Sequence, residues 1–168
     1  IRDGYNSWIY PSKPIELADL DEDSRTDIVI PWSGWLRNLG TSKFSVAPTN
    51  YLPNEQIYIV SSAVADFDMD GHQDVAAVTA TEDGQASVLF VYTRAPNRPD
   101  DYTKIHVDQG CYPKTAPDQM RYIWQIYAAD LDQDGDPDLV AYTDNGIGYY
   151  KNLYHESNAV KHFGELEY

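Results

Sequence analysis

The hydrophobic pattern of this chain consists of short apolar runs, each of which follows a strongly acidic segment. The clearest runs are residues 28–30, 75–78 and 139–141. Asp-Gly or Asn-Gly hairpin signals follow the second and third of these runs, at residues 82–84 and 144–146. No long stretch repeats its apolar residues with the 3.6-residue period of a helix. The pattern therefore predicts an all-β chain.

Strands are expected to recur in units of four: one entering the acidic segment, one leaving it, an aromatic strand and an outer strand. In the second unit the expected strands are residues 57–65, 74–81, 87–93 and 102–107. In the third unit they are residues 122–129, 138–142, 147–152 and 160–166. Segment 94–120 contains four prolines, which predicts the second outer strand followed by a long, Pro-rich surface loop near 94–120.

The acidic segments are three copies of one nine-residue motif with Asp at positions 1, 3, 5 and 9, here called loop one, loop two and loop three. Their first residues lie 47 and 64 residues apart, which is the spacing of propeller blades. Position 6 is Gly in loops two and three and Ser24 in loop one. The candidate ligands, loop by loop, are Asp19, Asp21, Asp23, Arg25 and Asp27; Asp66, Asp68, Asp70, His72 and Asp74; and Asp130, Asp132, Asp134, Asp136 and Asp138.

Four carboxylates within nine residues repel one another, because two like charges in contact cost about 4 kcal/mol at an effective dielectric constant of about 20. Such a loop needs a cation, and a cage of oxygen ligands suits Ca²⁺, so up to three calcium ions are expected. Position 7 is expected to bind through its backbone carbonyl, which leaves the ring of His72 in solvent. Loop one should be the weakest site, because Ser24 costs about 1 kcal/mol if position 6 takes a positive φ.

An EF-hand loop also begins with Asp at positions 1, 3 and 5 and Gly at position 6. It requires Glu at position 12 and a helix on each side. Here position 12 is Ile30, Ala77 or Ala141, and the flanking residues have the pattern of strands. The loops are therefore not predicted to be EF-hands.

The loops and their apolar strands resemble the FG-GAP/VCBS repeat family, which includes the calcium-binding blades of integrin α-subunit propellers. Residues 34–39 (GWLRNL) and 148–153 (GYYKNL) match the aromatic-basic-Asn strand frequent in such blades, whereas residues 87–94 depart from it. The resemblance implies β-propeller-type blades of four antiparallel strands, with calcium in the loops. It implies no particular activity, because the family includes adhesion receptors, lectins and non-catalytic arms of enzymes.

On this interpretation the whole chain, 1–168, is one propeller segment with about three blades, approximately 9–53, 54–110 and 121–168. Closed propellers usually have four to eight blades, so we expect an incomplete ring with open blade edges. Three explanations are open: the chain is part of a larger polypeptide, completes a ring with other copies, or stacks head to tail into a fibre. The expected partners are proteins or other copies of the chain across these edges.

Composition favours a protein that is secreted or lies at the cell surface. The net charge of −15 argues against nucleic acid or an anionic membrane as a partner, and no apolar stretch is long enough for membrane insertion. Weak calcium sites suit extracellular fluid, where calcium is millimolar. Because the first residue is Ile1, we expect a processed mature protein or an excerpt of a longer one. Cys111, the single cysteine, is expected to be a free or buried thiol or to pair with another chain.

No catalytic role is predicted, because the histidines lack metal-ligand spacing and no nucleophile elbow or phosphate loop is present. The favoured function is a non-catalytic interaction or adhesion module of a larger protein or assembly. One alternative is a structural subunit that polymerises into an extracellular fibre or ring. Another is a carbohydrate-binding arm of a polysaccharide-active enzyme, in which Trp32 and Trp35 would stack on sugar, although packing between blades is the favoured role of the aromatic residues.

Overall fold

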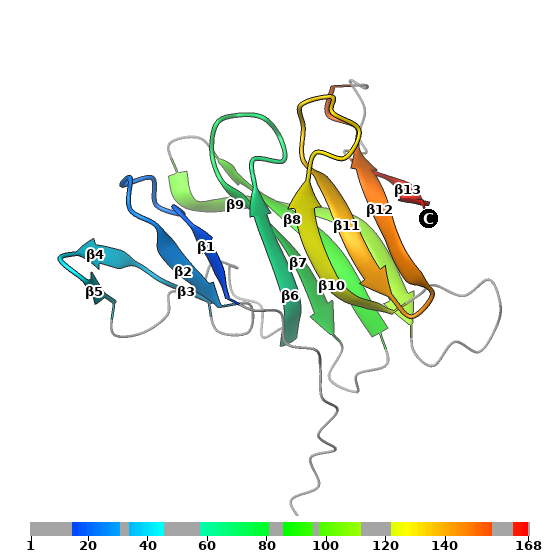
Figure 1. Cartoon of the computed structure of the whole chain (residues 1–168), viewed down its shortest axis with the longest axis horizontal. Coiled ribbons are helices and arrows are strands. Elements are labelled where there is room, and N and C mark those ends of the chain that lie inside the picture. The colour runs from blue at the N-terminus through cyan, green and yellow to red at the C-terminus, as the bar shows by residue number, and fades with distance from the viewer. Residues whose placement is uncertain are drawn as a thin grey trace, which may run out of the picture.

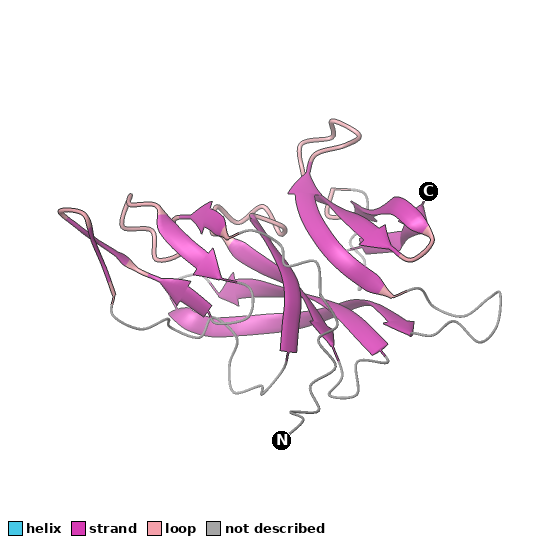
Figure 2. Ribbon diagram, turned by 60° about the horizontal axis from the view of Figure 1, so that its bottom comes forward, coloured by secondary structure: helices cyan, strands magenta, loops and turns pink. Residues whose placement is uncertain are grey.

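Every secondary-structure element in the described part of the chain is a β-strand. The computed structural model describes residues 15–30, 34–45, 58–80, 86–95, 98–111, 122–155 and 163–167. The strands form four antiparallel sheets, none of which is closed. The prediction of an all-β chain is thus confirmed, and Figure 2 shows strands joined by loops throughout these ranges.

Three sheets, here called unit one, unit two and unit three, lie side by side (Figure 1). Unit one contains β1 (Glu16–Ala18), β2 (Asp27–Ile30) and β3 (Gly34–Leu36). Unit two contains β6 (Tyr58–Ala65), β7 (Asp74–Ala80), β8 (Ala86–Ala95) and β9 (Arg98–Cys111). Unit three contains β10 (Ile123–Ala129), β11 (Asp138–Thr143), β12 (Gly146–Asn152) and β13 (Phe163–Glu167). The fourth sheet is the hairpin of β4 (Asn38–Gly40) and β5 (Lys43–Phe44).

Strand β7 shows why unit two forms the middle of the molecule. All seven of its residues are buried, although successive side chains point to opposite faces of the sheet. Ala76 and Val78 join a core cluster shared with unit three, whereas Val75 and Ala77 join a second cluster shared with unit one. A strand buried on both faces reads as a continuous apolar run, which is the pattern of residues 75–78.

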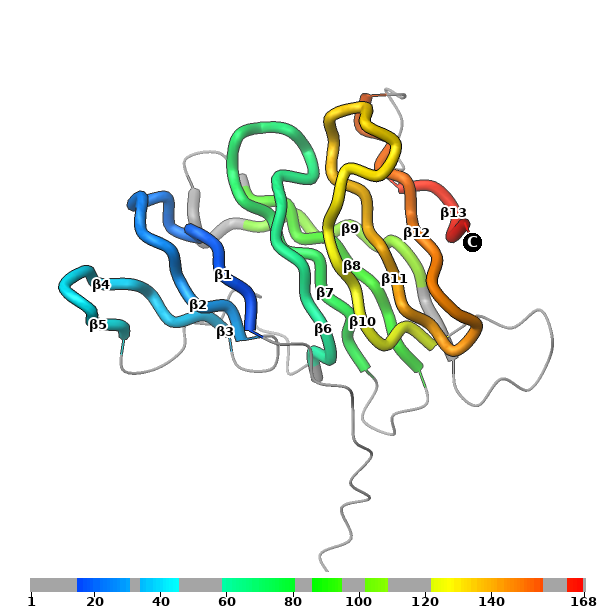
Figure 3. Tube along the Cα trace, in the orientation of Figure 1, coloured from blue at the N-terminus to red at the C-terminus, as the bar shows by residue number. Residues whose placement is uncertain are grey.

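The first strands of neighbouring units are joined by hydrogen bonds to polar side chains. The N–H of Val64 in β6 donates to Glu16 in β1 at 3.1 Å, and the N–H of Ile126 in β10 donates to Ser61 in β6 at 3.1 Å. Strands β1, β6 and β10 therefore follow one another across the molecule (Figure 3). As a result, the three acidic loops lie along the same edge of the three sheets (Figure 1).

The Pro-rich segment 94–120 is less loop-like than the sequence predicts. Strand β8 continues to Ala95, and the 14-residue strand β9 occupies 98–111 and pairs with β8 along most of its length. Proline is tolerated here because β9 is the edge strand of its sheet, where Pro99 need not donate a ladder hydrogen bond. The predicted outer strand over 102–107 is therefore confirmed and extends further in both directions than expected, whereas residues 112–120 of the predicted loop lie outside the described ranges.

The aromatic strand of unit one is also shorter than its counterpart in unit three. Residues 34–39 resemble 148–153 in sequence, yet β3 ends at Leu36 and β4 begins at Asn38, whereas β12 is continuous. Residue Arg37 separates the two short strands, and β4 turns away to pair with β5. This break moves the chain of unit one out of its sheet after three strands.

Candidate metal centres

The three acidic loops share one backbone conformation. The dihedral angle φ is positive at positions 4 and 6 of every loop: Glu22 (59°), Ser24 (67°), Met69 (55°), Gly71 (91°), Gln133 (65°) and Gly135 (101°). Position 6 of loop one thus has the positive φ that is expected to strain Ser24. The left-handed residue at position 4 was not predicted, because Glu, Met and Gln are not residues that favour this conformation.

Backbone N–H groups hold the carboxylates at positions 1 and 5. Asp66 accepts hydrogen bonds from the N–H groups of positions 5 and 6 at 3.0 and 2.9 Å, and Asp19 does the same at 3.1 and 2.8 Å. Asp70 accepts from the N–H of His72 at 2.8 Å. These local bonds close the loop tightly and bring its other carboxylates near one another.

The carboxylate at position 9 ties each loop to the segment that follows the second strand. Asp74 Oδ2 accepts from the N–H of Phe67 at 2.9 Å, and its Oδ1 accepts from the N–H of Arg94 at 2.8 Å. Asp27 and Asp138 form the same two bonds, and all three carboxylates are completely buried. The residues that supply the second N–H, here called anchor residues, are Asn38, Arg94 and Asn152.

Each loop brings three carboxylate oxygens within 4.8 Å of one another. The clusters are Asp19, Asp21 and Asp27; Asp66, Asp68 and Asp70; and Asp130, Asp132 and Asp138. Such clusters could hold a metal ion, and oxygen donors suit a hard cation. The predicted side chains that lie outside the clusters are Asp23, Asp74, Asp134, Asp136, Arg25 and His72.

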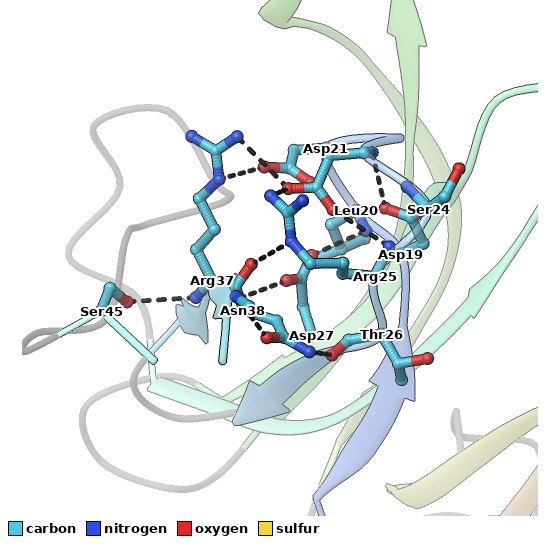
Figure 4. Close-up of polar contacts among 12 residues, drawn as sticks. Asp19, Leu20, Asp21, Ser24, Arg25, Thr26, Asp27, Arg37, Asn38 and Ser45 are labelled. Carbon is cyan, nitrogen blue, oxygen red and sulfur yellow. Dashed lines mark hydrogen bonds and ion pairs between the residues drawn. The ribbon is translucent and has the colours of Figure 1, made fainter. Parts of the chain in front are cut away.

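Two guanidinium groups pair with the carboxylates of loop one (Figure 4). Arg37 forms ion pairs with Asp21 and with Asp23, the latter at 3.4 Å, and Arg25 also pairs with Asp23. Burial raises the pKa of Asp21, and Arg37 opposes that shift. These internal cations offset part of the repulsion that a metal ion would otherwise offset, which supports the ranking of loop one as the weakest site.

Loop two lacks such an internal cation. Among the described residues, no Lys or Arg forms an ion pair with Asp66, Asp68 or Asp70. Burial and the charge of Asp70 raise the pKa of Asp68, and its Oδ1 is buried with no hydrogen-bond partner in the described part of the chain. A buried carboxylate oxygen without a partner is costly. Loop two differs from the other two loops in that no Lys or Arg among the described residues offsets the charge of its cluster.

Loop three contains one internal cation and one buried carboxylate that was predicted only through its backbone. Lys151 Nζ lies 2.5 Å from Asp132 and 3.7 Å from Asp134, and its hydrogen bond lowers the pKa of Asp132. Asp136 at position 7 is completely buried, and the backbone of His155 approaches its carboxyl group. Burial, with the charge of Asp134, raises the pKa of Asp136 to about 6.

The ring of His72 is partly exposed to solvent and also lies in a contact between loops one and two. Its Nδ1 is 2.5 Å from Glu22 Oε1, and Arg94 Nη1 lies 3.1 Å from the same oxygen. The hydrogen bond to Glu22 raises the pKa of His72. Sequence reasoning missed Glu22 and Arg94. The available signal was that Arg94 stands near the end of the second aromatic strand, where unit three has Asn152.

Of the two tryptophans predicted to stack on sugar, the structure describes Trp35 but not Trp32. Trp35 in β3 is partly buried and packs against the cluster that contains Leu20, Val29 and Tyr92. This contact is the packing role that the sequence favoured. Trp32 lies outside the described residues, so stacking on a sugar stays a prediction.

Comparison of the chain with protein-family models, with curated proteins and with solved structures finds no match. In the described part of the chain no helix is long and apolar enough to cross a membrane.

The strain at position 6 of loop one predicts the effect of a glycine there. Ser24→Gly should raise the free energy of unfolding by about 0.5–1 kcal/mol, because glycine adopts a positive φ without the steric cost of a Cβ. The reverse change in loop two, Gly71→Ser, should lower it by a similar amount, since a Cβ there has open space but the wrong φ. Urea unfolding of both variants checks this, and two unchanged midpoints would contradict it.

The buried carboxylates predict how stability depends on pH when calcium is chelated. Burial raises the pKa of Asp74 to about 7, whereas the unfolded carboxyl titrates near pH 3.9. Between these values the unfolded chain releases a proton that the folded chain keeps, so stability falls as pH rises and the loss is complete above pH 7. In buffer from which calcium has been removed beforehand, urea unfolding should show about 2–4 kcal/mol less stability at pH 8 than at pH 5. A metal-free stability that rises over this range would refute the assignment.

Proposed function

We propose that this chain is a calcium-binding, β-propeller-type segment of the FG-GAP/VCBS kind, with units one, two and three as consecutive blades. The observation that carries the proposal is the repetition of one loop structure. The same two positions have a positive φ, the same position-9 carboxylate makes two buried hydrogen bonds, and a carboxylate cluster forms each time. Repetition of this detail at blade-like spacing supports a common ligand for all three loops.

Calcium is the ion that best fits these loops. The donors are carboxylate oxygens, to which position 7 can add a backbone carbonyl, and Ca²⁺ accepts six to eight such ligands in flexible geometry. Asp66, Asp68 and Asp70 would hold the ion in loop two. When bound, the ion supplies positive charge that removes repulsion within the loop, so its binding energy adds to the folding energy.

The proposed role of the segment is non-catalytic: an interaction or adhesion module of an extracellular protein or assembly. Millimolar extracellular calcium would saturate sites of modest affinity, which suits loops whose carboxylates are partly paired with Arg or Lys already. The calcium loops lock the first two strands of each unit, and the sheet faces remain for contact with partners. Acidic clusters are accounted for by the ion without assigning them to acid–base chemistry.

Calcium titration of single-loop variants tests the proposal. Asp68→Ala should weaken the tightest site at least about tenfold, since a charged ligand is lost where no internal cation compensates. Asp132→Ala should have an intermediate effect, and Asp21→Ala the smallest, because Arg37 already pairs with Asp21. Isothermal titration calorimetry, with magnesium in place of calcium as the control, measures these affinities. Equal effects in all three loops would refute the ranking, and no calcium binding by the unaltered chain would refute the proposal.

A further inference from the structure

The two interfaces between units contain the same polar link. The anchor residue of one unit donates to the carbonyl at position 2 of the preceding loop. Arg94 Nη1 donates to Leu20 O at 2.7 Å, and Asn152 Nδ2 donates to Phe67 O at 2.9 Å. The side chains of Leu20 and Phe67 are only 4% and 1% exposed, because each interface covers them. One donor–acceptor pair therefore recurs where one unit packs on the next.

The anchor residue of loop one, Asn38 in β4, is held as Asn152 is held. Its N–H donates to Asp27 at 2.7 Å, and its Nδ2 donates to Thr26 O at 3.0 Å. Asn152 Nδ2 likewise donates to the carbonyl of position 8 in its own loop, at 3.2 Å, and also reaches the preceding unit. In both residues the side-chain oxygen accepts a backbone N–H two residues later. Asn38 is thus positioned in the same way as the interface donor Asn152. Within the described ranges no earlier loop supplies a carbonyl for it to bind.

The outer face of unit three is the counterpart of a face that is buried in unit two. Strand register and loop position relate four residues of unit two to four of unit three. In unit two Ala63, Phe67, Val78 and Leu89 are at most 1% exposed, because unit three covers them. The corresponding residues of unit three are Tyr127 (44%), Leu131 (46%), Tyr142 (46%) and Ile147 (69%). Large apolar side chains are therefore exposed on the face of unit three whose equivalent in unit two is buried.

Unit one exposes the other half of the same interface. Ile15 and Leu17 are 51% and 67% exposed. By loop position they correspond to Ile126 and Ala128, which pack in the core between units two and three. Asn38, in β4 just after this unit, is tied to its loop through Asp27. The two ends of the described structure thus carry the two complementary halves of a contact that the chain already makes twice internally.

We propose that unit three of one copy of this chain packs on unit one of a second copy, head to tail, and repeats the internal interface. Asn38 of the second copy donates to the carbonyl of Leu131, in the way that Asn152 donates to Phe67. This inference rests on the proposed function only in treating the units as equivalent blades. A second copy is the occupant because it supplies the complementary face, the donor and the register together. Such a contact is heterologous, so it closes into a ring or extends into a filament. Two copies would provide six units, within the range of closed propellers.

Blocking the two faces separately tests the proposal. Light scattering with size exclusion in calcium should show the unaltered chain as a dimer or larger particle. Ile147→Arg and Leu17→Arg should each weaken self-association at least about tenfold, because a charge would be buried on one face of the contact. Thr103→Arg, at an exposed position on β9, is the control and should associate normally. Asn38→Ala should weaken association while leaving the melting temperature within a few degrees.

Mixing the two blocked variants separates head-to-tail contact from other arrangements. Each variant keeps one intact face, so an equimolar mixture should form a one-to-one heterodimer that neither forms alone. If Leu17→Arg has no effect while Ile147→Arg abolishes association, like faces meet and the proposal is overturned. A monomer at all concentrations up to about 100 μM, where even a weak contact would be populated, also overturns it. Calcium titration of the same samples is independent, so oligomers without calcium binding would refute the proposed function and leave this contact standing.

Discussion

Chelation of calcium with EGTA is expected to lower the melting temperature of this protein by about 10–25 °C. At a calcium concentration of 10 to 100 times the dissociation constant of a loop, bound calcium adds about 1.4–2.7 kcal/mol to the free energy of unfolding. Three loops together contribute about 4–8 kcal/mol, and each kcal/mol shifts the melting temperature of a chain of this size by about 2–4 °C. The physical source is the clustered carboxylates, whose mutual repulsion the ion removes.

Thermal unfolding followed by circular dichroism, with and without EGTA, measures the shift directly. Addition of excess calcium should restore the original midpoint, whereas magnesium should restore less of it, because Mg²⁺ demands a stricter octahedral geometry. Asp68→Ala should reduce the size of the shift, because its loop no longer contributes fully. A melting temperature that EGTA does not change would contradict the proposal that this protein binds calcium.

Asp74→Ala is expected to lower the free energy of unfolding by about 3–5 kcal/mol, and much of that loss should persist in EGTA. The carboxylate is completely buried and accepts the N–H groups of Phe67 and Arg94. Removing it leaves two buried donors without an acceptor, each at a cost of about 1–3 kcal/mol. Position 9 therefore acts as a brace between the loop and the third strand as well as a candidate ligand.

Two matched variants separate the brace from the metal ligand. Asp74→Asn keeps one acceptor oxygen and should lose about half as much stability as Asp74→Ala. Asp68→Ala removes a cluster carboxylate that accepts no such pair of backbone bonds from distant segments, so its cost should largely vanish in EGTA. Urea unfolding of the three variants in calcium and in EGTA gives the comparison. If the cost of Asp74→Ala also vanished in EGTA, position 9 would act through the metal alone.

The strands of units two and three could be predicted closely from local patterns. Strand β7 was expected over 74–81 and is formed over 74–80, and β12 was expected over 147–152 and is formed over 146–152. Alternation of side chains and turn residues are local properties, so they are legible in a single sequence. The full length of β9 could not be predicted from the sequence, because prolines suggest a loop unless the strand is known to lie at the edge of a sheet.

The acidic loops could be found from residue spacing, but the division of labour within them could not. Asp27, Asp74 and Asp138 all look like ordinary ligands in the sequence, yet each also accepts two backbone N–H groups, and only Asp27 and Asp138 belong to the carboxylate clusters. Likewise, the spacing of loop one does not reveal that Arg37 pairs with Asp21. Hydrogen bonds and ion pairs of this kind depend on which strand returns beside the loop.

For this chain, local sequence was enough to predict the β class and the acidic clusters that could hold a metal ion. These features depend on residues that are near one another along the chain, where spacing and residue type leave few alternatives. The links between units became visible only in three dimensions. Arg94 and Leu20 are 74 residues apart in the sequence, and Asn152 and Phe67 are 85 residues apart. No local sequence pattern therefore predicts either contact. The exposed faces of units one and three have the same origin, because only packing decides which side of a strand is covered.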